Sequence, residues 1–548
     1  MFFPESSSKF WKIPDNAQLK GKERGDLVSN GRANHGESIL DRLEDLKKSS
    51  DQASDIVRDL AEEFKISKAS VSSITSFYNI DTGSDRICKG LPCSLKYPES
   101  PDGENIRYFE KESCLGYCDH APVVRLGGKY FTREDQSLKE IEDSTAEYVM
   151  NAREDFSKYT ETGGYKVLDK VLKADDFGQY MDALQKSGLK GMGGAGFPVI
   201  AKWKSLTDDA RKDAFLLING HEGEPGTFKD RHIMEIYPHR VVEGALLTAI
   251  LNGLHNVIIA IKSEYRNARE SMQSAIAELG QKHSDALGRI KVEVLSVPGS
   301  YVTGEETALM ESVEGKRGEP RLRPPFPTQK GLHGKPTIVH NVETVYHIPE
   351  ILASGGNEIS KFYSLTGDVK SPGIYQERLG INAVDLVEKD GLSRSNTIKA
   401  FMPGGLSGGI LPGSDISIHL DFDSVRKAGA GLGTGAIIAL SHDRCIVDTT
   451  YKIARFFEKE SCGKCVPCRI GTARISSLLK DIVNGNATDA EIEDGKRIAA
   501  VMIDGSICAL GQVAGRTFVD ALSRFEGEFQ EHLDGKCPAG VCFSEEKQ

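Results

Sequence analysis

The stretch Lys190-Gly-Met-Gly-Gly-Ala-Gly-Phe-Pro198 decides the fold of the middle of this chain, together with the segments on either side of it. Residues 177–187 before it have the apolar spacing of a helix, and residues 214–218 after it have that of a buried strand. The fingerprint of an ordinary Rossmann unit needs a strand first and a helix second, so this stretch does not fit it. Its glycines instead leave a bare loop whose amides can approach a phosphate or a flat ring.

Two further glycine turns follow the expected strand. They are Asn219-Gly-His-Glu222-Gly-Glu224-Pro-Gly-Thr-Phe-Lys-Asp-Arg231 and Gly299-Ser-Tyr-Val-Thr-Gly-Glu305-Glu306-Thr-Ala-Leu-Met. An asparagine and carboxylates at the strand ends of a parallel α/β layer are placed to bind ribose or flavin hydroxyls. Each turn by itself is also consistent with a glycine turn beside a solvated acidic face. Three such turns in one α/β unit favour a nucleotide site.

The cysteines form three spaced groups, which in a reducing compartment favours metal binding over disulfides. The most specific group is Glu460-Ser-Cys462-Gly-Lys-Cys465-Val-Pro-Cys468-Arg469, with Cys508 farther along the chain. Three closely spaced thiolates and a distant fourth suit a [4Fe–4S] cluster, and structural zinc is the weaker alternative. Residues 448–457, 472–483 and 489–503 have helical apolar spacing, so we expect a small helical bundle at this end of the chain.

The other two cysteine groups are less decisive. One follows helical segments at 38–64 and 68–77 and suits an iron–sulfur cluster or structural zinc, with simple burial of its thiols as a third interpretation; it consists of Cys88, Cys93, Cys114 and Cys118. The other would complete a tetrahedral zinc site and consists of Cys445, His532, Cys537 and Cys542. A solvent-facing cysteine pair is the alternative for this last group, because no spacing rule ties Cys445 to the tail.

The composition excludes several classes of protein. A chain of 548 residues at about 150 per domain suggests three to four domains, and 39% hydrophobic with 27% charged residues is typical of globular proteins. The best apolar runs, 257–261 and 436–440, are much shorter than the roughly 18 residues of a membrane helix. The first residues lack a secretory signal, so we expect a cytoplasmic protein with no direct membrane span. The net charge of −11 disfavours nucleic acid as a partner.

Together these motifs resemble the NADH-oxidising flavoprotein (diaphorase) subunits of complex I, of NAD-dependent formate dehydrogenases and of NAD-linked multimeric hydrogenases. The resemblance covers nearly the whole chain after residue 35. Besides the glycine turns and the Glu460–Arg469 motif, it rests on Glu314-Gly-Lys-Arg-Gly-Glu-Pro-Arg-Leu-Arg-Pro-Pro-Phe-Pro327 and His340-Asn-Val-Glu-Thr344. The helices before Cys88 and the two loops that carry the first cysteine group resemble the thioredoxin-like ferredoxin subunit beside the flavoprotein of complex I. That resemblance implies a [2Fe–2S] cluster in this group.

The resemblance also implies a multidomain α/β fold. Its expected parts are an N-terminal extension (1–35), a thioredoxin-like [2Fe–2S] domain with helices at its start (36–140), a linker (141–175), a Rossmann-like domain for FMN and NAD(H) (176–350), a β-grasp (SLBB-like) insert (351–440), a helical bundle with the [4Fe–4S] cluster (441–525), and a C-terminal tail with a zinc site (526–548).

Site residues are implied in the same way. FMN is expected to contact Gly191, Gly193, Lys202, Asn219, Tyr301, Gly304, Glu305 and Asn341, with the carboxylate of Glu222 beside them. Aromatic faces can stack on adenine and carboxylates can accept ribose hydroxyl bonds, so the nicotinamide nucleotide is expected at Phe197, Glu224, Glu306, Arg323 and Phe326. Four positions depart from the family pattern: Met192 replaces Arg, His221 replaces Asp, Arg323 replaces Lys, and His340 replaces Asn.

These cofactors predict the activity. FMN exchanges a hydride with NAD(H) as two electrons, whereas each cluster carries one, so the flavin converts between the two. Hydride transfer demands no acid or base from the protein, and no catalytic side chain is assigned. The rival class is a non-catalytic electron-transfer scaffold with a degenerate nucleotide site.

The resemblance implies a partner protein with molybdenum, tungsten or a hydrogenase site, together with further iron–sulfur subunits. The stretch Met402-Pro-Gly-Gly-Leu-Ser-Gly-Gly-Ile-Leu-Pro412 and the nonbasic Met192 favour a formate dehydrogenase. The tail from His532 to Cys542 favours a hydrogenase, electron-bifurcating or not, and complex I is a further alternative.

Overall fold

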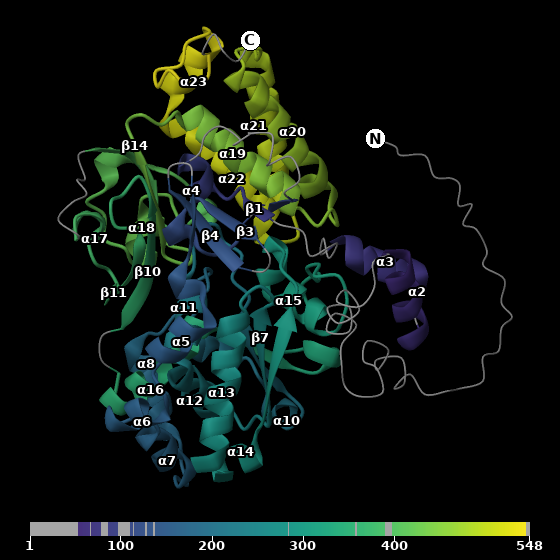
Figure 1. Ribbon diagram of the computed structural model, residues 1–548, viewed down its shortest axis with the longest axis vertical. Helices are drawn as coiled ribbons and strands as arrows, with labels where there is room; N and C mark the ends of the chain where they lie inside the picture. The colour runs from purple at the N-terminus through teal and green to yellow at the C-terminus, as the bar shows by residue number, and fades with distance from the viewer. Residues whose placement is uncertain are drawn as a thin grey trace, which may run out of the picture.

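The computed structural model describes residues 53–65, 67–77, 86–96, 110–112, 114–126, 129–134, 137–282, 284–356, 359–389 and 397–543. The expected N-terminal extension, residues 1–35, lies outside these ranges, as do the start of the helical segment expected at 38–64 and the last residues of the tail. Within the described ranges the chain is a mixed α/β protein of several layers, with a helical C-terminal region above two of its sheets (Figure 1).

A four-stranded parallel sheet forms the centre of the molecule, in the order β8-β7-β6-β9. Its register pairs Asn219 with Asn341, so both asparagines lie at the carboxyl edge of the sheet. The strand expected at 214–218 is β6, and the apolar run 257–261 lies within β7. The strands are β6 (Phe215–Gly220), β7 (Asn256–Lys262), β8 (Lys291–Val297) and β9 (Thr337–Asn341).

Helices cover both faces of this sheet because its strands are apolar on both sides. Leu216 and Ile218 of β6 share a core with α12, whereas Leu217 packs on the other face with Leu309 and Met310 of α15. The helices of this layer are α11 (Lys229–Ile236), α12 (Pro238–Leu251), α13 (Arg266–Lys282), α14 (Ser284–Arg289), α15 (Glu306–Val313) and α16 (Val342–Ser354), with short helical turns η3 (Tyr301–Gly304) and η4 (Leu332–Gly334).

Short helices precede the central sheet. The helix expected at 177–187 is α8, and the glycine loop runs from it into α9. Residues 141–175, expected to be a linker, contain three helices whose Tyr159, Tyr165 and Leu168 belong to the same core as α12. The elements are η2 (Glu142–Ser144), α5 (Ala146–Ala152), α6 (Phe156–Glu161), α7 (Lys166–Leu172), α8 (Gly178–Ser187), α9 (Val199–Lys204) and α10 (Asp208–Arg211).

A second, mixed sheet follows α16 in the chain, in the order β11-β10-β14-β12-β13. In it β10 runs parallel to β14, and the other pairs are antiparallel. The elements are β10 (Ser360–Gly367), β11 (Gly373–Arg378), α17 (Ala383–Val387), β12 (Ile398–Met402), η6 (Leu406–Gly408), β13 (Leu411–Pro412), η7 (Gly413–Asp415), α18 (Phe422–Lys427) and β14 (Ala436–Ser441).

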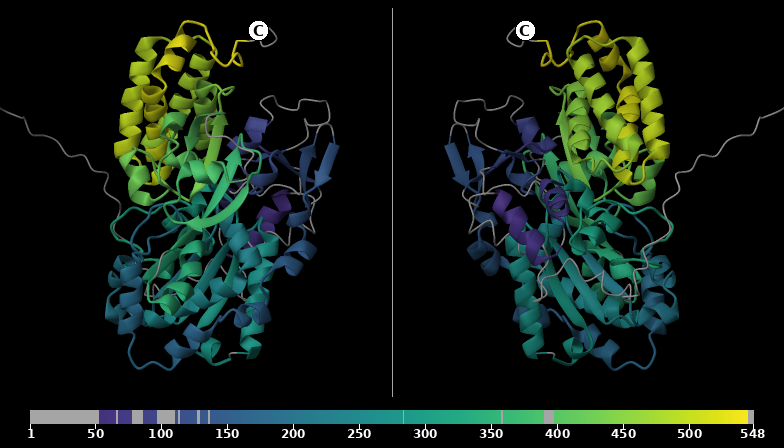
Figure 2. Two further views of the ribbon diagram at one scale, coloured as in Figure 1. Left: turned by 90° about the vertical axis from the view of Figure 1, so that its left-hand side faces the viewer. Right: turned by 90° about the vertical axis from the view of Figure 1, so that its right-hand side faces the viewer.

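The C-terminal region is a helical bundle, as expected. The segments predicted at 448–457, 472–483 and 489–503 each lie inside a longer helix. Figure 2 shows the bundle standing beyond the sheets, in yellow-green to yellow. Its helices are α19 (Ile446–Glu460), α20 (Val466–Val483), α21 (Asp489–Gly505), α22 (Ala509–Arg524) and α23 (Glu526–Leu533).

The N-terminal part forms a separate five-stranded sheet, in the order β2-β1-β3-β4-β5. It packs against the central layer, where the Arg231 guanidinium lies 3.9 Å from the Tyr117 ring centre and the Tyr130 hydroxyl donates to the Glu264 carbonyl at 3.4 Å. The elements are α2 (Ala53–Glu63), α3 (Lys68–Phe77), β1 (Arg86–Cys88), α4 (Leu91–Lys96), β2 (Glu110–Glu112), η1 (Cys118–His120), β3 (Val123–Leu126), β4 (Lys129–Glu134) and β5 (Ser137–Glu140).

Among the described residues, no helix is both long enough and apolar enough to cross a lipid bilayer.

Candidate functional site

The three glycine turns meet at the carboxyl edge of the central sheet. The Asn219 amide nitrogen donates to the Gly304 carbonyl at 2.9 Å, which joins the second turn to the third. A side chain at Gly193 would place its Cβ 2.9 Å from the Cβ of Asn341, so only glycine allows the first turn to approach this asparagine so closely. The structure therefore brings together four of the residues expected around FMN.

Tyr301 connects this edge to the helical bundle. Its hydroxyl donates to Glu224 at 2.8 Å, and its backbone N–H donates to Glu460, which precedes the cysteine motif, also at 2.8 Å. Glu224 further accepts from the Ser407 N–H at 2.9 Å. Burial raises the pKa of Glu224 to about 7. Ser407 lies on η6 of the second sheet, and no sequence pattern indicated this contact.

Basic and acidic side chains face one another around α15. Glu305 caps this helix by accepting from the N–H groups of Thr307 and Ala308, both at 2.9 Å. Arg323 pairs with Glu305 and lies 3.1 Å from Glu306. The Lys202 ammonium also donates to Glu306, at 3.1 Å. These residues, expected at the FMN and nucleotide sites, are thus neighbours.

The two aromatic residues expected to stack on adenine, Phe197 and Phe326, are each about half exposed to solvent. A large aromatic side chain with an open face retains the surface that a planar ligand would cover. Both therefore remain candidates for adenine binding.

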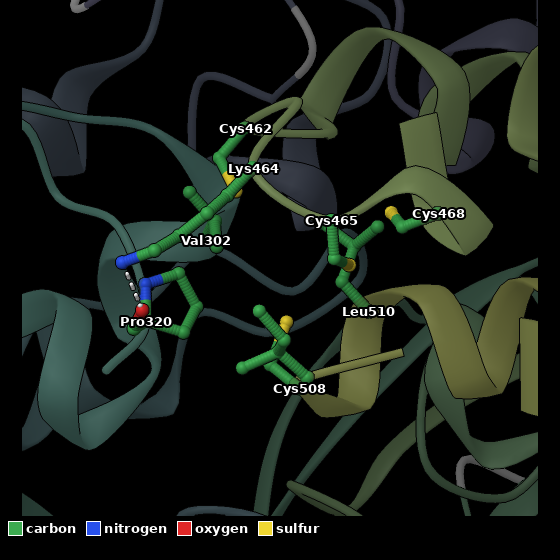
Figure 3. Close-up of a pocket in the computed structure, with 9 residues that line it drawn as sticks. Val302, Pro320, Cys462, Lys464, Cys465, Cys468, Cys508 and Leu510 are labelled. Atoms are coloured by element: carbon green, nitrogen blue, oxygen red, sulfur yellow. Dashed lines mark hydrogen bonds between the residues drawn. The ribbon is translucent and has the colours of Figure 1, made fainter. Parts of the chain in front are cut away.

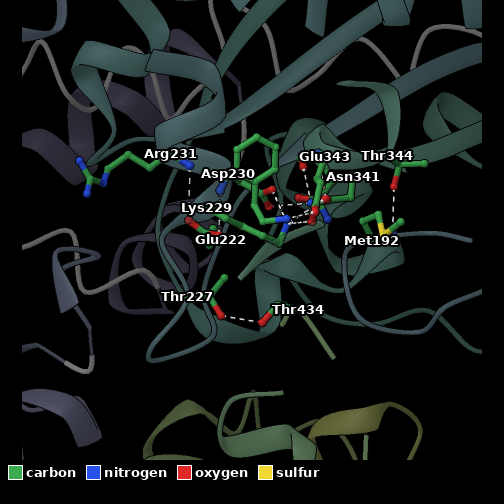
Figure 4. Close-up of polar contacts among 12 residues, drawn as sticks. Met192, Glu222, Thr227, Lys229, Asp230, Arg231, Asn341, Glu343, Thr344 and Thr434 are labelled. Atoms are coloured by element: carbon green, nitrogen blue, oxygen red, sulfur yellow. Dashed lines mark hydrogen bonds and ion pairs between the residues drawn. The ribbon is translucent and has the colours of Figure 1, made fainter. Parts of the chain in front are cut away.

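A buried ionic cluster, defined by Lys229, Asp230, Glu343 and Lys361, supports Asn341 from below (Figure 4). The Lys229 ammonium lies 2.6 Å from Asp230 and 3.0 Å from Glu343, and it donates to the Asn341 carbonyl oxygen at 3.2 Å. The Asn341 amide nitrogen donates in turn to Asp230 at 2.6 Å. Sequence analysis missed this cluster, because Lys361 comes from β10 of another sheet.

Glu222 has a different environment from the other acidic residues. Its carboxylate accepts from the backbone N–H groups of Asp230 and Arg231 at the start of α11 and from the Tyr265 hydroxyl. Burial raises its pKa to about 7. The carboxylate is therefore engaged within the protein, and its contact with a cofactor stays a prediction.

Three of the four departures from the family pattern are buried. Met192 is fully buried, and its N–H donates to Thr344 at 2.9 Å. The His340 imidazole accepts from the Trp203 indole at 2.7 Å, and burial holds its pKa well below the usual range. His221 lies 3.2 Å from the Pro298 carbonyl through Nε2, while burial lowers its pKa to about 4. A carbonyl only accepts, so Nε2 carries the proton and Nδ1 is a bare acceptor.

The second cysteine group lines a pocket with about 280 Å³ of open space, between the bundle and η3 (Figure 3). The pocket is lined by Val302, Pro320, Cys462, Lys464, Cys465, Cys468, Ile507, Cys508 and Leu510. Burial raises the pKa of Cys468 to about 11 and that of Cys508 to about 12. Thiolates become favourable there only with positive charge among them, which iron supplies.

The first cysteine group is buried between the N-terminal sheet and the central layer. Its four thiols are Cys88, Cys93, Cys114 and Cys118, and the last two lie 3.6 Å apart. Bonds from the Cys118 and Cys88 thiols, with the charge of Lys262, hold the pKa of Cys114 well below its usual range. The structure thus brings together two loops that were predicted to form one site.

The third group also converges. The ligand atoms of Cys445, His532, Cys537 and Cys542 all lie within 4.8 Å of one another, with Cys445 Sγ 3.3 Å from His532 Nε2. His532 Nδ1 bonds the Glu528 carbonyl at 2.7 Å, which leaves Nε2 for a metal. The four groups suit tetrahedral zinc. The interpretation of a solvent-facing pair is less suitable, because Cys445 is buried.

A glycine-lined sheet edge with hydroxyl-binding groups, directly beside a four-cysteine pocket, defines a flavin- and iron–sulfur-dependent oxidoreductase. Two family descriptions match this chain. The Nuo51 FMN-binding domain matches residues 184–350, and the NADH-ubiquinone oxidoreductase-F iron–sulfur binding region matches residues 448–532.

The chain is 37% identical over 401 residues to the NADH-quinone oxidoreductase F subunit 2 of Rhizobium meliloti, which covers 70% of this chain and 95% of that protein. The NADH-quinone oxidoreductase F subunit of Aquifex aeolicus is also 37% identical, over 68% of this chain and 90% of its own length. The chain therefore belongs to the family of NADH-quinone oxidoreductase F subunits and is an NADH dehydrogenase module. The family predicted from the sequence is confirmed.

Among solved structures, the chain is similar to one in NAD+-reducing [NiFe]-hydrogenase in the H2-reduced state. The TM-score is 0.76 at 27% identity, with 90% of this chain and 93% of that chain covered. The air-oxidized state of such a hydrogenase gives a TM-score of 0.72. None of these relatives is a formate dehydrogenase, so that assignment stays a prediction.

Proposed function

We propose that this chain passes electrons between NAD(H), FMN and iron–sulfur clusters as the diaphorase subunit of a larger oxidoreductase. FMN, when bound, supplies the conversion between a two-electron hydride and single electrons. The protein's own residues bind and orient the two nucleotides and place the clusters near them. No side chain is needed as an acid or base.

One observation carries this proposal. The η3 turn is shared by both sites, because Gly304 bonds Asn219 at the sheet edge while Val302 lines the cysteine pocket. Tyr301 of the same turn bonds Glu224 on one side and Glu460 on the other. A flavin at this edge and a cluster in this pocket would therefore be separated by a single turn of chain.

The residues at the sheet edge fit FMN. The bare amides of the first turn and the Lys202 ammonium suit a phosphate, and the Asn219 and Asn341 amides suit ribityl hydroxyls or ring edges. His221 Nδ1 is buried and has no hydrogen-bond partner among the described residues. A buried acceptor of this kind is costly unless a bound group donates to it. We assign the FMN contacts to Gly191, Gly193, Lys202, Asn219, Glu222, Tyr301, Gly304, Glu305 and Asn341.

NAD(H) would bind beside FMN. Phe197 and Phe326 offer aromatic faces to the adenine, and Glu224 and Glu306 offer acceptors to the ribose hydroxyls. Arg323, which now neutralises the paired acids of α15, would meet the pyrophosphate.

The three cysteine groups would hold three different centres. We assign a [4Fe–4S] cluster to Cys462, Cys465, Cys468 and Cys508, and a [2Fe–2S] cluster to the first group. Structural zinc is assigned to Cys445, His532, Cys537 and Cys542.

This function divides the chain as the sequence predicted, with a thioredoxin-like unit at 36–140, a nucleotide-binding unit at 176–350, a β-grasp insert at 351–440, a cluster bundle at 441–525 and the zinc tail at 526–548. The separate N-terminal and second sheets support the first and third of these divisions.

The partner is the finer question. The hydrogenase neighbour supports a hydrogenase catalytic subunit, and the 402–412 stretch supports a formate dehydrogenase. Mass spectrometry of the complex co-purified from the native source separates the two, because a nickel–iron subunit supports the first and a molybdenum or tungsten subunit the second.

Spectroscopy of the anaerobically purified chain tests the activity itself. We expect flavin and cluster bands and reduction of an artificial dye by NADH. Cluster bands without flavin and without dye turnover would overturn the proposal in favour of the scaffold.

A further inference from the structure

A buried cation lies between the sheet edge and the first cysteine group. Lys262 is the last residue of β7 and is only 6% exposed. Its ammonium donates to the backbone carbonyl of Cys114 at 3.5 Å. The aliphatic part of the same side chain passes the third glycine turn, where a Cβ on Gly299 would lie 3.0 Å from Lys262 Cε.

Neighbouring contacts hold this side chain in place. The ammonium lies 5.6 Å from the centre of the Tyr265 ring, and that ring packs against the Gly116 backbone between Cys114 and Cys118. The Tyr265 hydroxyl is itself fixed by its bond to Glu222. Lys262 therefore cannot turn toward solvent without disturbing the loop that carries two of the cysteines.

The charges around Lys262 are arranged asymmetrically. Glu264 is the neighbouring carboxylate, and it lies beside Gly299 and accepts from the Ser263 hydroxyl at 3.0 Å. His221, the other titratable group on this side, is neutral because burial lowers its pKa to about 4. The positive end of this arrangement is thus the end that touches Cys114.

We propose that Lys262 raises the reduction potential of the centre held by Cys88, Cys93, Cys114 and Cys118. Adding one electron makes such a cluster more negative, and a buried cation beside it stabilises that reduced form more than the oxidised form. Lys262 acts as a positioning residue, through its charge, and contacts neither nucleotide in this assignment. This inference rests on the proposed [2Fe–2S] cluster.

The test is a redox titration of the purified full chain followed by electron paramagnetic resonance, with dithionite as the one-electron reductant. We expect Lys262→Met to lower the potential of the [2Fe–2S] signal by at least a tenfold change in the reduction equilibrium, which is about 59 mV for one electron. Lys262→Arg keeps the charge and should stay close to wild type. The [4Fe–4S] signal, bound elsewhere, is the internal control.

The two ways in which this inference could fail are distinguishable. A wild-type chain without a [2Fe–2S] signal would refute the cluster assignment itself. A normal signal in both variants, with an unshifted potential in Lys262→Met, would refute only the role of Lys262. If Lys262→Met loses the cluster, then Lys262→Gln with a retained signal supplies the measurement, and an unshifted potential there again refutes the role.

Discussion

Replacement of Lys229 by methionine would test the buried ionic cluster beneath Asn341. In the native chain two ammonium groups and two carboxylates share this space, so their formal charges cancel. Lys229 and Glu343 are both fully buried. Lys229→Met fills nearly the same volume but leaves one negative charge without compensation, and it removes a donor to the Asn341 side chain.

The expected loss is large. Removing one partner of a buried ion pair costs about 3–5 kcal/mol, which for a cooperative unit of this size corresponds to a thermal midpoint lower by roughly 6–20 °C. Burial opposes ionisation of Glu343, yet Lys229 and Lys361 hold its pKa well below the usual range. Its stabilising contribution is therefore present above the unfolded pKa of about 4.3 and is lost as the pH falls. The gap between wild type and variant should narrow in acid.

Scanning calorimetry between pH 4 and pH 8, with FMN content measured on the same samples, provides the assay. The double variant Lys229→Met with Glu343→Gln removes one charge of each sign and should recover part of the loss. Lys496→Met, at an exposed ion pair of α21, is the matched control and should change little. A Lys229→Met chain as stable as wild type at pH 7 would refute this account of the cluster.

Three further predictions concern the cofactor sites. Cys465→Ser should reduce the iron content from about six to about two atoms per chain, and a retained [4Fe–4S] resonance would contradict the ligand assignment. Cys537→Ala should remove about one zinc per chain while leaving flavin and iron unchanged; unchanged zinc by metal analysis would exclude this site. Because burial raises the pKa of Glu224 to about 7 and its carboxylate is the better acceptor, the KM for NADH should fall as the pH rises through 7. Glu224→Gln should abolish that dependence, and its persistence in the variant would assign it to another group.

Local patterns were sufficient to predict the secondary structure around the site. The helix at 177–187 and the strand at 214–218 follow from apolar periodicity, which depends only on nearby residues, and both are present as α8 and β6. The cysteine pocket was also predictable, because three of its ligands are close together in sequence. The mixed sheet, by contrast, pairs strands separated by long segments, and no local pattern reveals such pairing.

Side-chain partners from distant segments could not be predicted. Lys361 reaches Glu343 from another sheet, and Ser407 reaches Glu224 through a tight turn of that same sheet. The link between Cys445 and the tail had no spacing rule behind it, but packing of α19 against α23 brings the Cys445 sulfur to His532. Glu222 illustrates the opposite limit, since its place in an acidic motif did not indicate that its carboxylate bonds the start of α11.

Helix α19 has a cysteine of the third group at its start and the second group just after its end. Its 15 residues span about 22 Å, and each inserted residue would turn one end by about 100° relative to the other. Point substitutions on its outer surface leave this phase unchanged, whereas a single insertion or deletion would misalign one set of sulfurs. The length of this rod should therefore tolerate far less variation during evolution than its composition.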